Sequence, residues 1–462
     1  MKTLLSLLTL LLILTSCSEP LDQPNILFFL IDDQRNDVLS CAGHPFVKTP
    51  TVDMLAANGI RFTNAFVTTS ICAASRASIF TGLYETKHNY TFGKEPIIEE
   101  YILNSYPYLL KKSGYVTGFI GKFGIKIENQ DSLLYEMFDF IRLSPRSTPH
   151  FITMPDGSRR HSAEIKGDQA IEFISDQTAD KPFCLSVSFN AVHAVDGNLT
   201  PGNEGHYPYP AAVAQLYEDM EMPQPKLSDP EIFNNHPDFF KNSMNRERYL
   251  WRWDTEEKYQ INMKAYFRMI SGYDQVMGRV ISAMKGKGLD GNTVIIYSAD
   301  NGYYMGNRGF AGKWSHYEES LRVPMIIYDP RIRERDRGIS SDKMALNIDI
   351  PATILDLAGL EIPEIYQGAS LMPLINGEKA GDWRESFLCE HRMDNPTIPK
   401  YVGIRGKRYV YANYYEQTPP YEYLHDLEKD PDQLINFVND PEYQDILNDL
   451  RIQCKERENN LK

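Results

Sequence analysis

Two strongly apolar runs, each followed closely by carboxylate side chains, restrict the fold of this chain more than any other feature. The runs are Asn25–Ile31 and Asn292–Ser298. Uninterrupted apolar segments of this length are typical of parallel strands that are buried on both faces of a sheet. The sequence therefore predicts an α/β protein, in which ligands gather at the carboxyl ends of the strands.

The polar residues that follow these runs are candidate metal ligands. Asp32 and Asp33 follow the first run, and Asp300 and Asn301 follow the second after one alanine. Either pair alone is also a common turn sequence. At the ends of buried strands, however, adjacent carboxylates repel one another unless a cation neutralises them. An all-oxygen set suits calcium rather than zinc, so we predict one calcium site here.

The segment Ile71–Gly82 combines a thiol with features that attract an anion. Cys72, Ser75 and Arg76 have the spacing i, i+3 and i+4, which places them on one face if a helix begins near Cys72. A helix N-terminus and a guanidinium both favour a sulfate or phosphate ester. On these residues alone, a buried cysteine in a small-residue turn with an ordinary Arg76 ion pair is the simpler alternative.

The pattern Cys-x-x-Ser-Arg followed by Thr-Gly resembles the signature of type I sulfatases, with Ala74 in place of the usual proline. The resemblance implies the fold of the alkaline phosphatase superfamily, which is a large mixed α/β sheet flanked by helices with a smaller C-terminal antiparallel-sheet subdomain. It also implies that a formylglycine-generating (sulfatase-maturating) enzyme oxidises Cys72 to formylglycine (3-oxoalanine). The modified Cys72 is then the nucleophile and joins the four strand-end residues around calcium.

Three further segments extend the resemblance. Gly121–Gly124 is similar to a Gly-Lys-Trp-His motif, Phe189–His193 to a Phe-x-x-Pro-His motif, and the segment from Lys313 onward to a Lys-x-x-x-Tyr-Glu run that continues to Arg-Val-Pro. The resemblance implies that Arg76, Lys122 and Lys313 neutralise the sulfate and that His193 contacts it or protonates the leaving oxygen. Gly124 stands where the family has a histidine, which leaves the base that regenerates the aldehyde without an assigned residue.

Four other residues are secondary candidates. His316 lies close to Lys313 in the sequence and could replace the histidine that is missing at position 124, and His44 is a comparable choice. His391 and Arg392 follow Glu390 in the C-terminal region and could read substrate hydroxyls. For His391 and Arg392, an ordinary turn is the alternative.

The N-terminus reads as an export signal. Lys2 precedes an apolar run that is too short to span a bilayer, and Leu14-Thr15-Ser16-Cys17 resembles a bacterial lipoprotein box. We expect residues 1–17 to be a lipoprotein signal peptide with Cys17 lipidated, which would tether an exported protein to the cell membrane or to the outer membrane and periplasm. A simple secretory signal is the alternative. The expected domains are then a catalytic domain over residues 22–380 and a C-terminal subdomain over residues 381–462.

Two internal segments have contrasting patterns. Residues 200–252 are rich in Pro, Tyr, Asn and Trp without clear periodicity, which indicates an insertion over the active-site mouth, with aromatic rings that suit sugar stacking or local packing. Residues 265–285 show apolar side chains at three- and four-residue steps, which predicts a core helix.

The net charge of −14 argues against nucleic acid as a partner. The expected function is hydrolysis of sulfate esters on a sulfated oligo- or polysaccharide, such as algal ulvan. Two alternatives stay open: a phosphatase or phosphodiesterase on the same fold, which would use other nucleophiles and zinc ligands, and a glycan-binding lipoprotein without activity.

Overall fold

The computed structural model describes residues 23–145, 150–198, 205–378 and 381–461. A large mixed sheet of eight strands lies at its centre, in the order β10-β2-β9-β8-β1-β7-β3-β4. Strand β9 runs antiparallel to both of its neighbours, and the other paired strands of this sheet are parallel. The strands are β1 (Asn25–Ile31), β2 (Ile60–Phe66), β3 (Val116–Lys122), β4 (Phe140–Ser144), β7 (Phe183–Ser188), β8 (Thr293–Ala299), β9 (Met325–Tyr328) and β10 (Ile339–Leu346).

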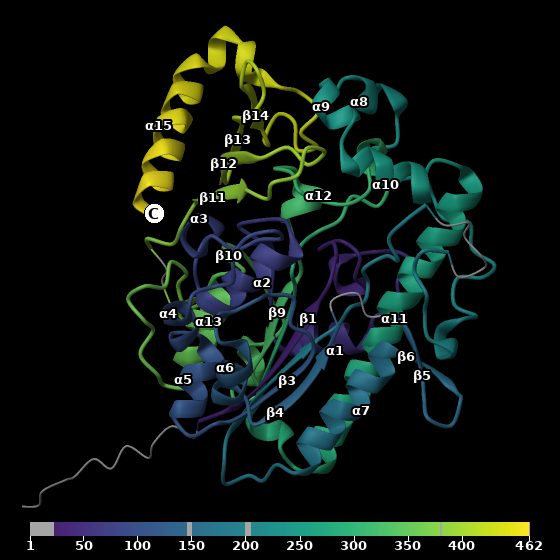
Figure 1. Ribbon diagram of the computed structural model, residues 1–462, viewed down its shortest axis with the longest axis vertical. Helices are drawn as coiled ribbons and strands as arrows, with labels where there is room; N and C mark the ends of the chain where they lie inside the picture. The colour runs from purple at the N-terminus through teal and green to yellow at the C-terminus, as the bar shows by residue number, and fades with distance from the viewer. Residues whose placement is uncertain (1–22, 146–149, 199–204, 379–380, 462) are drawn as a thin grey trace, which may run out of the picture.

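Helices cover both faces of this sheet (Figure 1). Helix α11 contacts α1 and α7 on one side, and α2, α5 and α13 contact one another on the other. The longer helices are α1 (Pro50–Asn58), α2 (Cys72–Thr81), α5 (Tyr106–Lys112), α6 (Gln130–Met137), α7 (Ser162–Ser175), α10 (Met244–Arg252), α11 (Glu256–Gly286) and α13 (Asp349–Leu357). The shorter ones are α3 (Glu85–His88), α4 (Glu99–Leu103), α8 (Pro230–Asn234), α9 (Asp238–Lys241), α12 (Glu318–Leu321) and α14 (Met372–Ile375).

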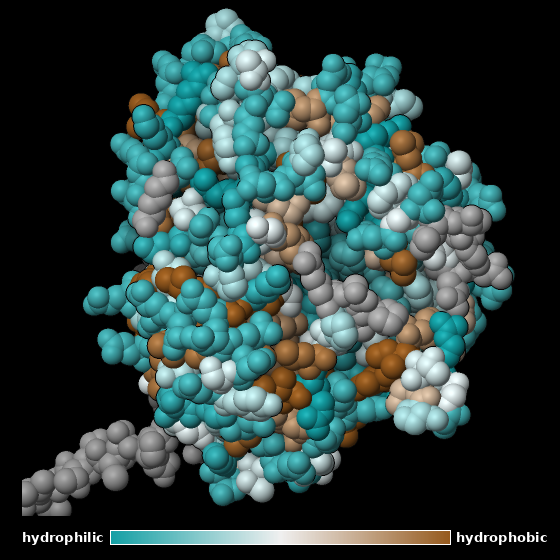
Figure 2. Space-filling view, in the orientation of Figure 1, coloured by the Kyte–Doolittle hydropathy of each residue, from teal (hydrophilic) through white to brown (hydrophobic). Residues whose placement is uncertain are grey.

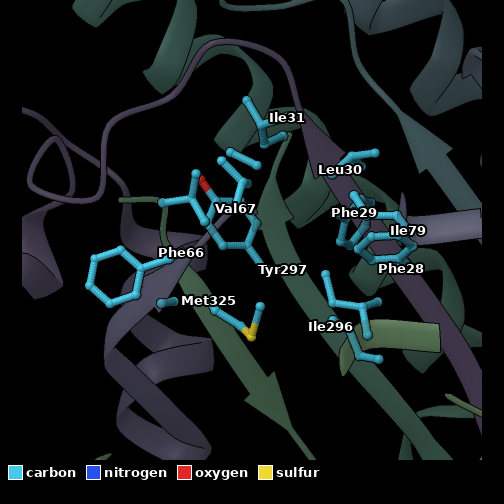
Figure 3. Close-up of a cluster of buried hydrophobic side chains, with 14 of the residues drawn as sticks. Phe28, Phe29, Leu30, Ile31, Phe66, Val67, Ile79, Ile296, Tyr297 and Met325 are labelled. Carbon is cyan, nitrogen blue, oxygen red and sulfur yellow. The ribbon is translucent and has the colours of Figure 1, made fainter. Parts of the chain in front are cut away.

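Strand β1 lies in the middle of the core. It pairs in parallel with β8 on one side and with β7 on the other, and each of its residues is buried. Its side chains pack against residues of β8, β9 and α2, as Figure 3 shows for Phe28, Ile296 and Ile79. The prediction of buried parallel strands is confirmed here, because both faces of β1 are covered by apolar side chains.

A second, antiparallel sheet forms the C-terminal unit, as predicted. Its order is β11-β12-β13-β14, and helix α15 (Gln444–Leu461) packs against it (Figure 1). The backbone N–H of Glu390 in β11 donates a hydrogen bond to the carbonyl oxygen of Thr68 (2.9 Å), which ties this sheet to the segment before α2. The strands are β11 (Ser386–His391), β12 (Tyr401–Gly406), β13 (Tyr409–Tyr414) and β14 (Tyr421–Asp426); a separate hairpin consists of β5 (Phe151–Thr153) and β6 (Arg159–His161).

One predicted helix boundary needs correction, and one predicted insertion gains detail. Helix α11 begins at Glu256, well before the expected residue 265, because Thr255 caps it by accepting a hydrogen bond from the backbone N–H of Lys258 (3.2 Å). The segment 200–252, which was expected to be an insertion over the active-site mouth, contains helices α8, α9 and α10 in its described part, and Met244 and Arg248 of α10 line the cavity described below. Short helices of this kind are fixed by tertiary contacts rather than by a long apolar period.

The signal peptide and the lipidation site at Cys17 lie outside the described residues. Within the described ranges, no helix is long and apolar enough to cross a membrane. The face of the molecule in Figure 2 is mostly hydrophilic, with apolar residues in small, scattered groups.

Candidate active site

The carboxyl ends of β1 and β8 bring the four predicted oxygen ligands together. Because Ile31 pairs with Ala299, the residues after the two strands are neighbours. The backbone N–H of Asp33 donates to Oδ1 of Asp300 (3.2 Å), and Nδ2 of Asn301 donates to Oδ1 of Asp33 (2.7 Å). Asp32, Asp300 and Asn301 are fully buried, and Asp33 is nearly so. A fixed set of hard oxygen atoms therefore lies at the centre of the sheet edge.

Helix α2 places Cys72 at its first position, as the motif predicted. Ile71 before it is extended, and its carbonyl oxygen accepts the first helical hydrogen bond, from the N–H of Ser75 (2.9 Å). Gly82 ends the helix in the left-handed region, with φ of 70°. The Ser75 hydroxyl accepts a hydrogen bond from Nδ2 of Asn347 (3.0 Å) and has a structural role. The thiol of Cys72 is thus held at a helix N-terminus, where an anion is favoured.

Arg76 connects three elements beneath the site. Its Nε donates to Oδ2 of Asp300 (2.8 Å), and its Nη1 donates to the carbonyl oxygen of Lys122 (2.7 Å). Nη2 lies 3.8 Å from Oδ2 of Asp32. The guanidinium is fully buried, so breaking either hydrogen bond would leave an uncompensated charge in the interior. Arg76 therefore fixes helix α2 relative to the ends of β8 and β3.

Two lysines complete the charged centre. Lys122, at the end of β3, pairs with Oδ2 of Asp32, and Lys313 pairs with Oδ1 of Asp33. Burial alone would lower the pKa of Lys313, but the charges of Asp33, Cys72 and Asp32 raise the pKa of this ammonium well above its usual value. Both ammonium groups are therefore fixed positive charges at the sites where the resemblance predicts sulfate binding.

The carboxyl groups of Asp32 and Asp300 differ in their proton affinity. Burial would raise the pKa of Asp32, but Lys122, His193 and Arg76 lower it well below its usual range. Burial together with the charge of Asp32 raises the pKa of Asp300 to about 6. Neighbouring carboxyls with opposite shifts are common at functional sites, because close like charges cannot both ionise freely.

His193 faces the same carboxylates from the loop after β7. Its Nδ1 lies 2.7 Å from the carbonyl oxygen of Ala194, which can only accept, so Nδ1 carries the proton and Nε2 holds a lone pair. Nε2 lies 3.7 Å from Oδ2 of Asp33. Burial lowers the pKa of His193 despite the nearby charges of Asp33 and Asp32. Two acceptor atoms thus face each other, which is an arrangement suited to a shared cation.

The donor set fits a metal ion on further grounds. The ligand atoms of Asp32, Asp33 and His193 all lie within 4.8 Å of one another. Oδ1 of Asp32 and Oδ1 of Asn301 are buried without a hydrogen-bond donor among the described residues. Because buried acceptors are nearly always satisfied, these oxygens indicate a cation as the partner. The three carboxylates at this centre are balanced by Arg76 and the two lysines, so a divalent ion would leave positive charge for an anionic substrate.

A cavity of about 570 Å³ opens above this centre, which is room for a small ligand. Five of the predicted site residues line it, namely Asp32, Cys72, Lys122, His193 and Lys313. The other four predicted site residues do not line the cavity but contact those that do, or one another, as described above; they are Asp33, Asp300, Asn301 and Arg76. The structure therefore brings together all nine catalytic and metal-site residues that the sequence suggested.

The secondary candidates lie elsewhere. None of His44, His316, His391 and Arg392 lines the cavity. His316 is buried against the C-terminal sheet, where its ring nitrogens contact the Tyr414 hydroxyl (2.8 Å) and Nε2 of His425 (3.1 Å). Arg392 is engaged in ion pairs with Glu390 and Glu458. The structure offers no route by which these side chains reach a substrate in this cavity.

Gly124 has a structural reason for lacking a side chain. Its φ is +77°, and a Cβ atom built on it would lie 2.6 Å from Cδ of Arg76. A histidine at this position would displace the arginine that holds α2. In this chain, Cδ of Arg76 therefore lies where a Cβ atom at position 124 would point.

Several residues that line the cavity escaped the sequence analysis. His150 precedes the β5–β6 hairpin, and burial lowers its pKa to about 3. Asp196 and Arg248 form one side of the cavity wall, and Trp314 directly follows Lys313. Of these four, only Arg248 lies in the insertion of residues 200–252, whose aromatic composition was the one sequence signal for this wall. The remaining wall is largely apolar and consists of Ile71, Phe92, Met244, Met393, Asn395 and Ile398, with Asn190, Ala194 and Val195.

Comparison with known proteins identifies the family. The sulfatase family model matches residues 24–360, and a model described as the C-terminal region of N-sulphoglucosamine sulphohydrolase matches residues 306–460. Because the first match spans most of the chain, the protein belongs to the sulfatase family and is an enzyme of that class. Its fold is the alkaline-phosphatase-like fold of the sulfatases.

The relatives are distant but cover nearly the whole chain. The protein is 27% identical to an N-acetylglucosamine-6-O-sulfatase of Bacteroides thetaiotaomicron, over 93% of this chain and 86% of that protein. It is also 27% identical to an ulvan-active sulfatase of Formosa agariphila, over 93% of this chain and 80% of the relative. A phosphonate monoester hydrolase of Silicibacter pomeroyi has a TM-score of 0.79 at 21% identity, covering 95% and 96% of the two chains. At that identity the likeness concerns the fold alone.

Proposed function

We propose that this sulfatase hydrolyses sulfate esters of a sulfated carbohydrate, with formylglycine at Cys72 as the nucleophile and calcium at the strand-end carboxylates. One observation carries the proposal: Cys72 opens helix α2 on the same cavity as the fixed cations Lys122 and Lys313. A thiol in a merely structural position would not require such a concentration of buried charge in a protein with a net charge of −14.

The reacting group has to provide two hydroxyls. When formed, formylglycine supplies a hydrated aldehyde, with one hydroxyl to attack sulfur and a second whose ionisation allows sulfate to depart. An unmodified thiol lacks the second hydroxyl and could not turn over. Calcium, when bound by Asp32, Asp33, Asp300 and Asn301, supplies a Lewis acid toward the sulfuryl oxygens.

The protein side chains have three roles in this proposal. Lys122 and Lys313 neutralise the charge that develops on the sulfuryl oxygens. Arg76 holds α2 and the carboxylates in position and adds a third positive charge. Lys313 and His193 protonate the departing sugar oxygen, and for His193 this requires that Nε2 first takes up a proton, which the negative charge of the bound ester favours.

The substrate proposal concerns a polysaccharide such as ulvan. It is supported by the ulvan-active relative and by the cavity, which has apolar side chains on its wall next to the charged residues at the strand ends. We further propose that a sulfatase-maturating enzyme modifies Cys72, and that Cys17 carries a lipid anchor that tethers the exported protein to a bacterial membrane.

Two alternatives each have one supporting observation. The fold is shared with a phosphonate monoester hydrolase, so it is compatible with a phosphorus ester as the alternative substrate. Gly124, in place of the family histidine, favours a glycan-binding protein without turnover.

A combined experiment tests these possibilities. The protein from its native host is assayed for release of sulfate from sulfated oligosaccharides and of phosphate from matched phosphate esters, and the Cys72 peptide is examined by mass spectrometry. We expect an aldehyde at Cys72, sulfate release, and loss of that release in the Cys72→Ala variant. An unmodified thiol without turnover would favour the binding protein. Substantial sulfate release by Cys72→Ala would refute the mechanism.

A further inference from the structure

A second charged group lies on the cavity wall, away from the strand-end centre. It consists of Arg248 and Arg252 on α10, which both pair with Asp196. Nη2 of Arg248 lies 3.0 Å from Oδ2 of Asp196, and Nη2 of Arg252 lies 2.8 Å from Oδ1. Two arginines thus share one carboxylate, and the group has an excess positive charge. No other carboxylate pairs with either arginine among the described residues.

The two arginines differ in their access to the cavity. Arg252 is fully buried, where it also donates to the Tyr303 hydroxyl (3.0 Å) and to the carbonyl oxygen of Val195 (3.2 Å). Arg248 and Asp196 line the cavity, whereas Arg252 does not. Since Arg252 holds Asp196 from within the protein, the unbalanced charge is presented to the cavity by Arg248.

Trp314 lies against this arginine. The guanidinium carbon of Arg248 is 4.8 Å from the centre of the Trp314 ring. Nε of Arg248 and Nε1 of Trp314 are both buried and lack a hydrogen-bond acceptor among the described residues. Unpaired donors of this kind are costly in a folded protein. Both side chains line the same cavity, so acceptor oxygens of a ligand at this wall would satisfy these donors once the side chains turn toward it.

The position of this wall is fixed relative to the sulfate-binding centre. Trp314 directly follows Lys313, and Nδ2 of Asn245 on α10 donates to the carbonyl oxygen of Lys313 (2.7 Å). The N–H of Met244 donates to the carbonyl oxygen of Thr397 (2.9 Å), which joins α10 to the loop that carries Asn395 and Ile398. The second charged group and the catalytic lysine therefore belong to one connected wall.

We propose that Arg248 and Trp314 form a subsite for a second anionic group of the substrate, so that the enzyme prefers sugars that carry a carboxylate or another sulfate besides the ester that is cleaved. The inference rests on the proposed function, because it takes the cavity as the substrate site. The shared chemistry is an oxyanion that accepts hydrogen bonds from a guanidinium and an indole N–H. The neighbouring apolar side chains of Met244 and Ile398 contact the remainder of the sugar.

Binding to full-length protein carrying Cys72→Ala tests the inference without turnover. Isothermal titration compares three disaccharides with the same sulfate ester: one with a neutral second sugar, one with a uronate and one with a second sulfate. We expect the uronate or the disulfated sugar to bind about 10- to 100-fold more tightly than the neutral one. The arm that shows the preference identifies the anion as carboxylate or sulfate. Equal affinity for all three sugars would overturn the proposal.

Variants of the subsite locate the preference. When Arg248→Gln is added to the Cys72→Ala protein, the preference for the anionic sugars should be abolished. Arg248→Lys should retain part of this preference because the charge remains. Trp314→Phe should weaken it less, since only one donor is lost. Lys241→Gln, on the exposed surface of α9, removes an equal charge outside the cavity and should keep the full preference. A full preference in folded Arg248→Gln protein would overturn the assignment.

The outcome is separable from that of the proposed function. Sulfate release by the Cys72 protein tests the activity, and the affinity ratio tests the subsite. A protein that binds anionic sugars selectively but releases no sulfate would refute the activity and support the subsite. A protein that releases sulfate but shows no preference among the three sugars would support the activity and refute the subsite.

Discussion

The floor and the outer wall of the cavity are built in different ways. The floor consists of residues at the ends of adjacent strands and at the start of α2, and its three carboxylates face three fixed cations. The outer wall comes from α10, the loop after Lys313 and the C-terminal unit, and it combines apolar side chains with one unbalanced arginine. The difference indicates that the floor determines the reaction, whereas the wall determines which sulfated molecule is accepted.

The largest effect is expected at the floor, from Asp300→Asn. The variant removes the negative charge that holds Nε of Arg76, and it replaces one of the predicted carboxylate metal ligands with a neutral amide oxygen. We expect sulfate release to fall by at least about a thousandfold, because several charged contacts are lost together. Calcium affinity, measured by titration, should fall as well. The exposed Asp37, which pairs with Arg35, offers a control: Asp37→Asn should retain activity. A similar loss of sulfate release in both variants would show that Asp300 is no more important for activity than an exposed aspartate.

A smaller effect is expected from Gly124→Ala. The added Cβ would lie 2.6 Å from Cδ of Arg76, and the residue has a positive φ. Gly93 is a matched control, since its φ is +84° and nothing lies within 4 Å of its Cβ position. We expect Gly93→Ala to lower the free energy of unfolding by about 1 kcal/mol, and Gly124→Ala by a further 1–3 kcal/mol or so, with about tenfold lower kcat. Urea unfolding and kinetics measure both. Equal behaviour of the two variants would show that Arg76 tolerates displacement.

The pH dependence of stability tests a buried charge outside the floor, which has no carboxylate partner among the described residues. Lys166 on α7 is buried, and burial lowers its pKa to about 7 from the ordinary value of 10.5. The unfolded chain therefore binds a proton that the folded chain does not between these two pH values. In this window the free energy of unfolding should rise with pH, by at most about 1.4 kcal/mol per unit. Below pH 7 the full cost of burying the charge applies.

Lys166→Met should remove that rise and stabilise the protein at pH 6. Denaturant unfolding at pH 6 to 9 measures the effect, with Lys112→Met on the exposed surface as control. An unchanged slope in Lys166→Met would show that the ammonium of Lys166 finds a partner or solvent in the folded state.

The smallest effect is expected at the outer wall, from Met393→Ala. The variant removes apolar contact area from the cavity without touching the charged floor. We expect KM for the sulfated sugar to rise about threefold, with kcat changed by less than about twofold, because the lost contact is the same in the ground state and the transition state. A fall in kcat with unchanged KM would contradict the assignment of the wall to substrate selection.

The sequence was sufficient for the floor because its signals are local. Strands β1 and β8 are apolar throughout, and their parallel pairing necessarily joins the residues that follow them. Helix α2 begins and ends where the motif indicated, and Gly82 provides its left-handed end. The large sheet and the C-terminal antiparallel sheet were also predictable, since their strands have clear apolar or alternating patterns.

The wall could not be predicted because distant contacts decide it. Arg248 reaches the cavity only because α10 is attached to the Lys313 backbone and to Thr397. His316 was an attractive candidate next to Lys313 in the sequence. Trp314 between them adopts a φ of 70°, and His316 is directed into the C-terminal sheet instead. A single unusual backbone angle thus separates neighbours that the sequence grouped together.

The span of chain between the two halves of the floor affects how the protein is made. Asp33 and Asp300 are 267 positions apart, and every residue of α2 is buried once the sheet has formed. During synthesis the Cys72 segment emerges long before β7 and β8 exist, so β1 then lacks both of its partners. Any enzyme that oxidises Cys72 has to reach the segment in this interval. Under the proposed mechanism, modification of Cys72 and folding would therefore compete, and a chain that folded first would lack the proposed nucleophile.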